Sequence, residues 1–215
     1  MTLERFEKIK NVLKKRQPDI EVILDGVHKP HNLAAILRTC DATGIGSIHA
    51  KSKNSQIGLN LKAASGSNHW VNMSIHNDLT KFYQSIIKKD YNIYVANNSM
   101  QAVDFREVDY TKPCAIILGA ELDGVSNNSI NLASQEIKIP INGMVDSLNV
   151  SVANAVILYE VQRQRERLGL YDEMKISENE YKNLLFELSY PKIASIFKKN
   201  KEKFPELNNE GQIIG

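Results

Sequence analysis

Polar side chains that could take part in chemistry lie in three loops, each of which follows a strand-like apolar run. The loops span residues 26–32, 119–124 and 142–147. In the third loop, Gly143 permits a left-handed backbone, and Asp146 or Ser147 can accept the first free N–H groups of a helix that opens there. A polar loop that meets a helix N-terminus, with Ser147 and Asn149 free to face a ligand, is typical of a binding site. The alternative is that Ser147 only caps the helix.

The signatures of several common enzyme classes are absent from the sequence. No Gly-x-Gly-x-x-Gly follows the first strand, which argues against a dinucleotide fold and against the common Rossmann-type methyltransferase. Residues 119–124 lack the Lys-Ser/Thr of a P-loop, and no Ser or Cys sits in a nucleophile elbow. His28 and His31 could form half of a metal site, but no carboxylate or cysteine is spaced to complete it, so we expect no metal.

Strand-like and helix-like segments alternate along most of the chain. Apolar runs predict strands at residues 21–25, 44–50, 69–75, 92–96, 114–119 and 136–140. Helical periodicity predicts helices at 3–16, 32–40, 55–64, 78–89, 126–133, 146–168, 177–188 and 191–203, with Asn32 as the N-cap of the second. This order predicts an α/β fold, a mainly parallel sheet flanked by helices, in which the three loops lie at carboxyl ends of strands and could converge. The last ten residues have few apolar anchors and are expected to fray.

Length and composition indicate one medium domain with extensions. The chain has 215 residues, of which 42% are hydrophobic and 24% charged, as in an ordinary globular protein. We expect a basic N-terminal helical extension at 1–18, a core at 19–160 and a C-terminal helical extension at 161–215. Cys40 and Cys114 are too few for a disulfide framework, and no apolar run is long enough to span a membrane, so a cytoplasmic protein is expected.

The distribution of charge is more informative than the net charge of +2. Basic residues gather in the first sixteen positions and again between 192 and 203. Such clusters can neutralise phosphates, although a charged terminal helix is often only a solvated face.

Three motifs, in order along some 125 residues, resemble those of the SpoU branch of the SPOUT RNA 2′-O-methyltransferases. They are residues 28–39 (HKPHNLAAILRT), 117–125 (ILGAELDGV) and 139–154 (IPINGMVDSLNVSVAN). Further stretches are similar to the tRNA guanosine-18 2′-O-methyltransferases within this family. These are 16–19 (RQPD), 64–68 (ASGSN) with Trp70, 102–107 (AVDFRE) and 159–165 (YEVQRQR).

The resemblance implies a deep trefoil knot in the C-terminal part of the core that holds S-adenosyl-L-methionine. The cofactor contacts implied are Ala96, Gly119, Ile139, Met144 and Leu148, largely through backbone groups. The catalytic residues implied are Arg38, Asn32, Glu121, Ser147 and Asn149. Arginine is almost always protonated, so we assign Arg38 the role of a cation that stabilises the developing alkoxide and holds phosphate, which leaves the proton acceptor open. Asn32 would orient Arg38 or the substrate, and Glu121 would pair with an arginine, for which Arg38 itself is a candidate.

The family also implies a homodimer in which Arg38 crosses to the site of the other subunit. The expected substrate is the ribose of guanosine 18 in the tRNA D-loop, and the expected partner is tRNA docked by the basic terminal helices. The RNA-binding residues predicted are Arg5, Lys8, Lys14, Lys15, Arg16, Arg38, Arg163 and Arg165. The alternatives are a 23S rRNA ribose 2′-O-methyltransferase of the same family and a catalytically inactive RNA-binding module.

Overall fold

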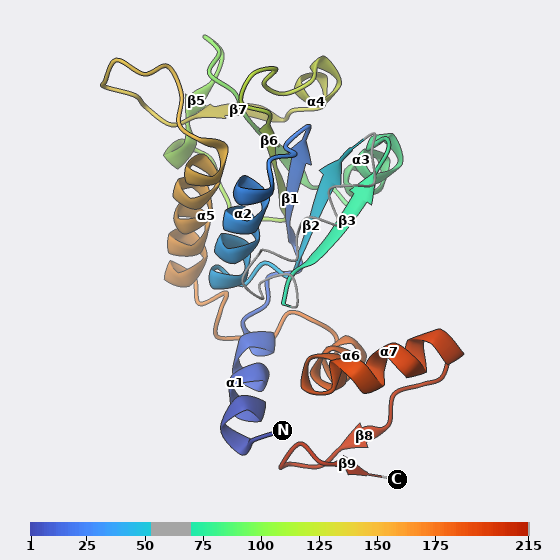
Figure 1. Ribbon diagram of the computed structural model, residues 1–215. Helices are drawn as coiled ribbons and strands as arrows, with labels where there is room; N and C mark the ends of the chain where they lie inside the picture. The colour runs from blue at the N-terminus through green and yellow to red at the C-terminus, as the bar shows by residue number, and fades with distance from the viewer. Residues whose placement is uncertain (53–69, 215) are drawn as a thin grey trace. The chain divides into compact units, whose positions relative to one another are not determined.

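The computed structural model describes residues 1–52 and 70–214, and the chain separates into two compact units (Figure 1). The core unit comprises residues 18–170, and the helical unit combines residues 1–17 with 171–215. We expected a boundary near residue 160, but the long helix α5 (Val150–Arg167) continues through that position as part of the core unit. Both ends of the chain belong to the same unit instead of forming two separate extensions.

The core unit is built on a parallel sheet. Within the described residues the sheet has seven strands in the order β3-β2-β1-β6-β4-β7-β5, and every neighbouring pair is parallel. The strands are β1 (Ile20–Asp25), β2 (Ser47–Lys51), β3 (Asn72–His76), β4 (Asn92–Ala96), β5 (Val103–Asp104), β6 (Cys114–Gly119) and β7 (Gln135–Lys138). The predicted α/β class with a parallel sheet is therefore confirmed.

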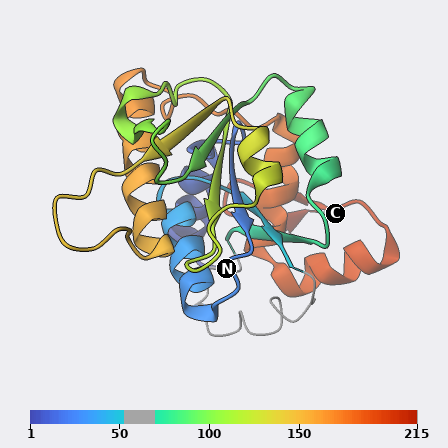
Figure 2. The same ribbon diagram turned by 90° about the horizontal axis from the view of Figure 1, so that it is seen from above.

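Helices cover both faces of this sheet, and the alternation of side chains along each strand explains why. Helices α2 (Pro30–Ala42) and α5 lie on one face, and α3 (Thr80–Ile87) and α4 (Asn127–Asn131) lie on the other (Figures 1 and 2). In β6, Ile116 and Leu118 pack toward α2 and α5, whereas Ala115 and Ile117 pack toward α3 and α4. Burial on both sides requires the continuous apolar run that made this strand predictable.

Several local predictions differ from the structure. The second strand starts at Ser47 and not at residue 44, because Gly44 takes a positive φ of 81° in the turn that ends α2. The short strand β5, the 3₁₀ turn Phe105–Glu107 and the hairpin of β8 (Glu206–Leu207) with β9 (Ile213–Ile214) were not predicted. The helix expected at 55–64 and the motif at 64–68 lie outside the described residues. The trefoil knot stays a prediction.

The helical unit has its own small core. Helix α1 (Leu3–Lys14) packs Phe6, Ile9 and Leu13 inward and contacts α6 (Glu178–Ser189), which is followed by α7 (Pro191–Asn200). The ring of Phe186 stacks on Phe204, with their centroids 4.9 Å apart. The C-terminal segment does not fray as expected, because its hairpin is tied to the unit by a 2.7 Å hydrogen bond from the Tyr190 hydroxyl to the carbonyl of residue 211.

Candidate active site

The three polar loops meet at the carboxylate of Glu121, in the turn after β6. Glu121 Oε1 accepts hydrogen bonds from the side-chain amides of Asn32 (2.9 Å) and Asn149 (3.0 Å). Asn149 uses its second amide hydrogen for the Oδ1 atom of Asn32, at 3.1 Å. Glu121 Oε2 binds the ammonium group of Lys29. The convergence predicted from the strand ends is therefore confirmed, and we call these four side chains the Glu121 network.

The contacts of Glu121 define what its carboxylate can do. Hydrogen bonds from Lys29 and then from Asn32 hold the pKa of Glu121 below its usual value. The carboxylate is therefore ionised at neutral pH, and both of its oxygens already have donors. These features suit an anchor for neighbouring groups better than a proton acceptor. Within one chain the cationic partner of Glu121 is Lys29, and the expected pairing of Glu121 with an arginine stays a prediction.

The helix starts around the network differ from the predictions. Helix α5 begins at Val150 and not at 146 or 147, because the N-cap is Asn149, whose Oδ1 accepts from the backbone N–H (2.9 Å) and the hydroxyl (2.5 Å) of Ser151. Helix α2 begins at Pro30, whose fixed φ favours the first helical position. Asn32 thus lies in the first turn and is not the N-cap, which frees its side chain for Glu121.

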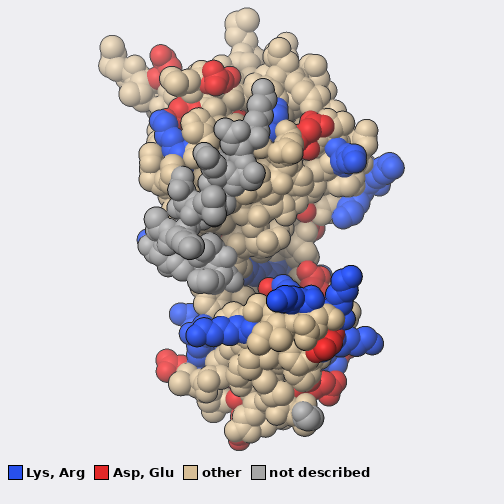
Figure 3. All heavy atoms as spheres, turned by 45° about the vertical axis from the view of Figure 1, so that its right-hand side comes forward, with Lys and Arg blue, Asp and Glu red and all other residues tan. Residues whose placement is uncertain are grey.

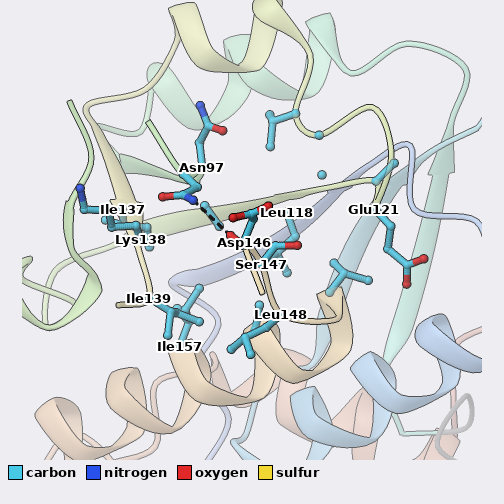
Figure 4. A pocket seen from close by; sticks show the side chains of 18 of the residues that line it. Asn97, Leu118, Glu121, Ile137, Lys138, Ile139, Asp146, Ser147, Leu148 and Ile157 are labelled. Carbon is cyan, nitrogen blue, oxygen red and sulfur yellow. Dashed lines mark hydrogen bonds between the residues drawn. The ribbon is translucent and has the colours of Figure 1, made fainter. Parts of the chain in front are cut away.

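A cavity of about 240 Å³ adjoins the network, with Glu121 at its edge (Figure 4). Its walls come from the carboxyl ends of β4, β6 and β7, the loop before α5, and the first turns of α5. Apolar side chains line much of it: Leu118, Ile137, Ile139, Ile141, Leu148 and Ile157. Polar groups come from Asn97, Asn98, Lys138, Asp146 and Ser147. A mainly apolar hollow with a few polar groups is typical of a small-molecule site.

Four of the five predicted cofactor contacts line this cavity, namely Ala96, Gly119, Ile139 and Leu148. Met144 does not line it, and its side chain is fully exposed (100%), so a contact of Met144 with the cofactor through its backbone stays a prediction. The loop that carries Met144 is held instead near Asp146, whose backbone carbonyl accepts a 3.1 Å hydrogen bond from the amide of Asn98. Sequence analysis missed Asn98, because it lies in a loop far from the three motifs.

Gly119 is required by a close approach of the backbone. A Cβ built at this position would lie 2.2 Å from the carbonyl carbon of Gly124 and 2.4 Å from the nitrogen of Val125. The turn closes on itself there through paired backbone hydrogen bonds of 3.0 Å between Ala120 and Gly124. This tight turn fixes where Glu121 can stand.

A buried carboxylate anchors the far end of the same turn. Asp25, 5% exposed at the end of β1, accepts hydrogen bonds at Oδ2 from the Ser126 backbone N–H (3.0 Å), the Ser126 hydroxyl (2.5 Å) and the Ser129 hydroxyl (2.8 Å). Burial alone would raise the pKa of Asp25, but the hydrogen bonds from the two serines outweigh it and hold the pKa below its usual value. The sequence offered one signal for this role, an acidic residue directly after a buried strand.

Arg38 stands apart from the Glu121 network within the chain. It lies on an exposed part of α2, and no hydrogen bond or ion pair engages its guanidinium among the residues described. Arg38 does not pair with Glu121 within one chain, and a pairing across the expected dimer stays a prediction. Ser147 is also exposed, lines the cavity, and is not the helix cap.

The predicted RNA-binding residues differ in exposure. Arg5, Lys8, Lys14 and Lys15 are exposed on α1 or just after it, and Lys and Arg side chains gather on the face of the helical unit drawn in Figure 3. Arg163 is exposed and pairs with Glu160. Arg165 is fully buried and donates to the Tyr110 carbonyl (3.0 Å) and to Asp19 (2.5 Å), so its predicted contact with RNA is wrong. Arg16 has 4% of its surface exposed, which leaves little of it for RNA.

Neither a cluster of metal ligands nor a membrane-spanning helix occurs in the part of the chain that the structure describes. Across residues 1–52 and 70–214, no three His, Cys, Asp or Glu side chains are grouped so that they could hold a metal ion. The helices in that part of the chain include none long and apolar enough to cross a membrane.

The sequence was compared with known proteins and the fold with solved structures. Residues 19–159 match the model of the SpoU rRNA methylase family, and residues 163–215 match its C-terminal model. A tRNA (guanosine(18)-2′-O)-methyltransferase of Escherichia coli (strain K12) is 42% identical over 215 residues, covering 99% of this chain and 94% of that protein.

Solved structures give the same result. The A. aeolicus TrmH/SpoU tRNA modifying enzyme superposes with a TM-score of 0.82 at 38% identity, covering 88% of this chain and 97% of that one. An AdoMet-bound rRNA methyltransferase from Sinorhizobium meliloti superposes with a TM-score of 0.59 at 27% identity, covering 72% of this chain and 59% of that one. On the extent of these matches, the chain belongs to the SpoU methylase family.

Proposed function

We propose that this protein is a tRNA 2′-O-methyltransferase that uses S-adenosyl-L-methionine to methylate the ribose of guanosine 18 in the D-loop. The observation that carries the proposal is the Glu121 network at the edge of the cavity, because it joins all three family motifs in one site. The tRNA guanosine-18 activity for which the E. coli relative is named supports the choice of substrate, because this chain matches that protein almost end to end. A tRNA-modifying role would place the protein in the cytoplasm.

The cavity suits S-adenosyl-L-methionine in chemistry. Its apolar walls, among them Leu118, Ile139 and Ile157, can enclose an adenine ring, while Asn98 and Asp146 border it with polar groups. The volume of about 240 Å³ lies somewhat below the usual range for ligand pockets, which begins at about 300 Å³. When bound, the cofactor supplies a methyl group on a cationic sulfur, so the site needs no further electrophile. The residues that would hold it are Ala96, Gly119, Ile139 and Leu148.

The residues of the chain would contribute mainly position and charge. Asn32 and Asn149, fixed by the anionic Glu121, would hold the ribose or a neighbouring loop in one orientation. The exposed hydroxyl of Ser147 would offer a hydrogen bond next to the reacting atoms. Arg38 would stabilise the negative charge that develops on the ribose 2′-oxygen. We assign no residue as the proton acceptor. Glu121 is poorly suited to that role, because both of its carboxylate oxygens already accept hydrogen bonds.

A homodimer would supply Arg38 to this site. Within one chain Arg38 projects from the exposed part of α2, away from any described partner. The neighbouring helix α5 exposes Val152 (47%) and Tyr159 (54%), which is apolar surface of the kind that subunit interfaces cover. In this arrangement a monomer would lack the cation and would be inactive.

The exposed basic residues of the helical unit would dock the body of the tRNA. Their contacts would be with phosphates, which position a folded RNA without reading its sequence. Arg5, Lys8, Lys14 and Lys15 on or next to α1 are the candidates that remain exposed, and Arg38 and Arg163 are the candidates in the core unit. Deleting α1 would not test this idea, because Phe6, Ile9 and Leu13 form part of the core of that unit.

The main test is to incubate the purified protein with unmodified tRNA and S-adenosyl-L-methionine and to map the methylated nucleotide. We expect a single 2′-O-methylguanosine at position 18. Arg38→Ala should keep its affinity for the cofactor and lose methyl transfer by about 10²-fold or more. Arg106→Ala, which also removes an arginine side chain but one paired with Asp104 outside the site, is the control and should retain activity. No methylation of any tRNA, or an Arg38→Ala variant with full turnover, would contradict the proposal.

Two alternatives are separated by simple competition and binding experiments. If the protein is a 23S rRNA methyltransferase, rRNA fragments will be methylated in preference to tRNA when both are present. If it is an inactive RNA-binding module, calorimetric titration with S-adenosyl-L-methionine will show no binding. The mainly apolar cavity favours binding.

A further inference from the structure

The loop that precedes α2 places a lysine where sequence analysis expected an arginine. Lys29 stands at the N-cap position of α2, and its ammonium group contacts Glu121 Oε2. The Lys29 side chain is 47% exposed and that of Glu121 is 27% exposed. This cation therefore sits at the edge of the active site and in contact with solvent.

The Lys29–Glu121 contact contributes little to stability, whatever its geometry. Ion pairs between exposed side chains contribute about 0–1 kcal/mol, because water and salt screen them and because two side chains lose freedom. Lys29 can therefore leave Glu121 at small cost when a stronger anion arrives. Glu121 would keep its position, since Asn32 and Asn149 still donate to its other oxygen.

The surroundings of Lys29 favour an anion next to its ammonium group. Helix α2 starts with no side-chain cap and has no acidic residue of its own in its first turn, so Glu121 is the anion that meets both Lys29 and the positive end of this helix. A lysine ammonium is a compact charge that binds phosphate well. Under the proposed function, the target ribose brings a phosphate on each side into this site, and Arg38 can satisfy only one of them.

We propose that Lys29 is a phosphate ligand for the RNA substrate. In the free enzyme it rests on Glu121, and on binding it exchanges that carboxylate for a phosphate next to the target ribose. This inference rests on the proposed function and adds a residue to the substrate-binding site. In this exchange Glu121 competes with the RNA phosphate for the ammonium group of Lys29.

The first test is the salt dependence of tRNA binding, measured by fluorescence anisotropy with an unmodified tRNA transcript between about 50 and 200 mM KCl. Lys29→Met keeps the length of the side chain and removes the charge. We expect its tRNA affinity to fall three- to tenfold and the slope of log K against log salt to decrease by about 0.9, the value for one phosphate contact in a duplex, or by about 0.7 in a single strand. Lys29→Arg should restore both quantities, and Lys88→Met, which removes an exposed lysine at the C-cap of α3, should change neither.

The second test uses the competition between Glu121 and RNA. Glu121→Gln should tighten tRNA binding while it lowers the rate of methyl transfer, because it frees Lys29. In a Lys29→Met background the same change should give no such gain in affinity. Cofactor affinity, measured by calorimetry, should be unchanged in Lys29→Met, which verifies a folded site.

An unchanged salt slope in Lys29→Met would overturn the inference and leave Lys29 as a support for Glu121 alone. A gain in tRNA affinity from Glu121→Gln that persists in the Lys29→Met background would also overturn the inference. Such a gain would reflect only the loss of a negative charge near RNA. The proposed function is judged separately by whether the wild-type protein methylates tRNA. A wild-type enzyme that methylates guanosine 18 with no slope change in Lys29→Met would refute only the role of Lys29.

Discussion

Asp25 offers the sharpest test of how the active-site turn is held, and we predict that Asp25→Ala destabilises the core unit strongly. Its Oδ2 atom accepts three hydrogen bonds, from the Ser126 N–H and from the hydroxyls of Ser126 and Ser129, and Lys51 lies 3.3 Å from Oδ1. Ser129 is itself linked to the hydroxyl of Tyr83 at 2.7 Å. Removal of the carboxylate leaves these donors without their acceptor.

The magnitude follows from the number and burial of these bonds. A hydrogen bond to a charged group contributes about 1.5–3 kcal/mol, and desolvation of the carboxylate offsets part of that sum. Breaking a buried charged network typically costs about 3–5 kcal/mol, so we expect about 4 kcal/mol for Asp25→Ala. For a chain of this length that corresponds to a fall in Tm of about 10 °C. Asp25→Asn keeps one oxygen acceptor and should lose about half as much.

Urea unfolding at fixed protein concentration measures these differences. Asp123→Ala is the matched control, because the same change is made in the same turn at an exposed position with no described partner, and it should cost less than about 0.5 kcal/mol. Ser126→Ala should fall between, at about 1 kcal/mol, since the backbone N–H still reaches Asp25. If Asp25→Ala is within about 1 kcal/mol of the wild type, the turn is not held by this carboxylate.

The same residue predicts a pH dependence. The folded pKa of Asp25 lies below its unfolded value of about 3.9, so its contribution is fully present above that value. That contribution is lost as the pH falls through the lower, folded pKa. Stability of the wild type should therefore decline in acid below about pH 4, and the decline should be smaller in Asp25→Asn. Parallel curves for the two proteins would contradict this assignment.

Four other predictions follow from single residues. Asn154 is fully buried in α5, and neither of its amide atoms has a hydrogen-bond partner among the described residues. Asn154→Leu, which is similar in shape, should therefore raise the free energy of unfolding by about 1–2 kcal/mol in urea, and a lower free energy of unfolding would refute this. Arg165→Met should cost about 3 kcal/mol by breaking a buried ion pair, yet leave tRNA affinity unchanged where the protein is folded. Gly119→Ala should weaken cofactor binding by at least about tenfold in calorimetry, because the new Cβ meets the backbone of Gly124. Burial, and then the neighbouring His49, lower the pKa of His76 in the folded protein. The stability that His76 contributes is therefore complete above its unfolded pKa of about 6.5 and declines as the pH falls toward the folded pKa. Thermal melts of His76→Asn should show a weaker dependence of Tm on pH in that window.

The elements that sequence analysis located well are those whose signal is local. The strands β4 and β6 are continuous apolar runs buried on both faces, and their ends were predicted to the residue. The start of α2 was missed because Asn32 is an acceptable cap in isolation, and the start of α5 was missed because Asp146, Ser147 and Asn149 are all acceptable caps. The choice among them depends on Asn149 also reaching Glu121, a contact between residues 28 positions apart.

Arg165 shows how a charged residue can be misread. It lies in a polar stretch at the end of a long helix and was predicted, together with Arg163, to bind RNA. The helical repeat nevertheless places it four residues after Val161 and seven after Leu158, both of which are buried. That spacing was visible in the sequence and marks the inner face of α5. By contrast, Arg163 lies off this face and is exposed.

The location of the active site follows from the order of the strands, which no local pattern encodes. Strands β1 and β6 are parallel neighbours, and their register pairs Asp25 with Gly119 at the carboxyl edge of the sheet. The first motif begins just after β1 and the second starts within β6, so this one pairing brings Lys29 and Asn32 to Glu121. Asp25 holds the far end of the turn, and the approach of Gly119 to Gly124 closes the near end. Glu121 therefore lies on a turn that is fixed at both ends, which explains how an exposed carboxylate can orient side chains from two other, distant parts of the chain.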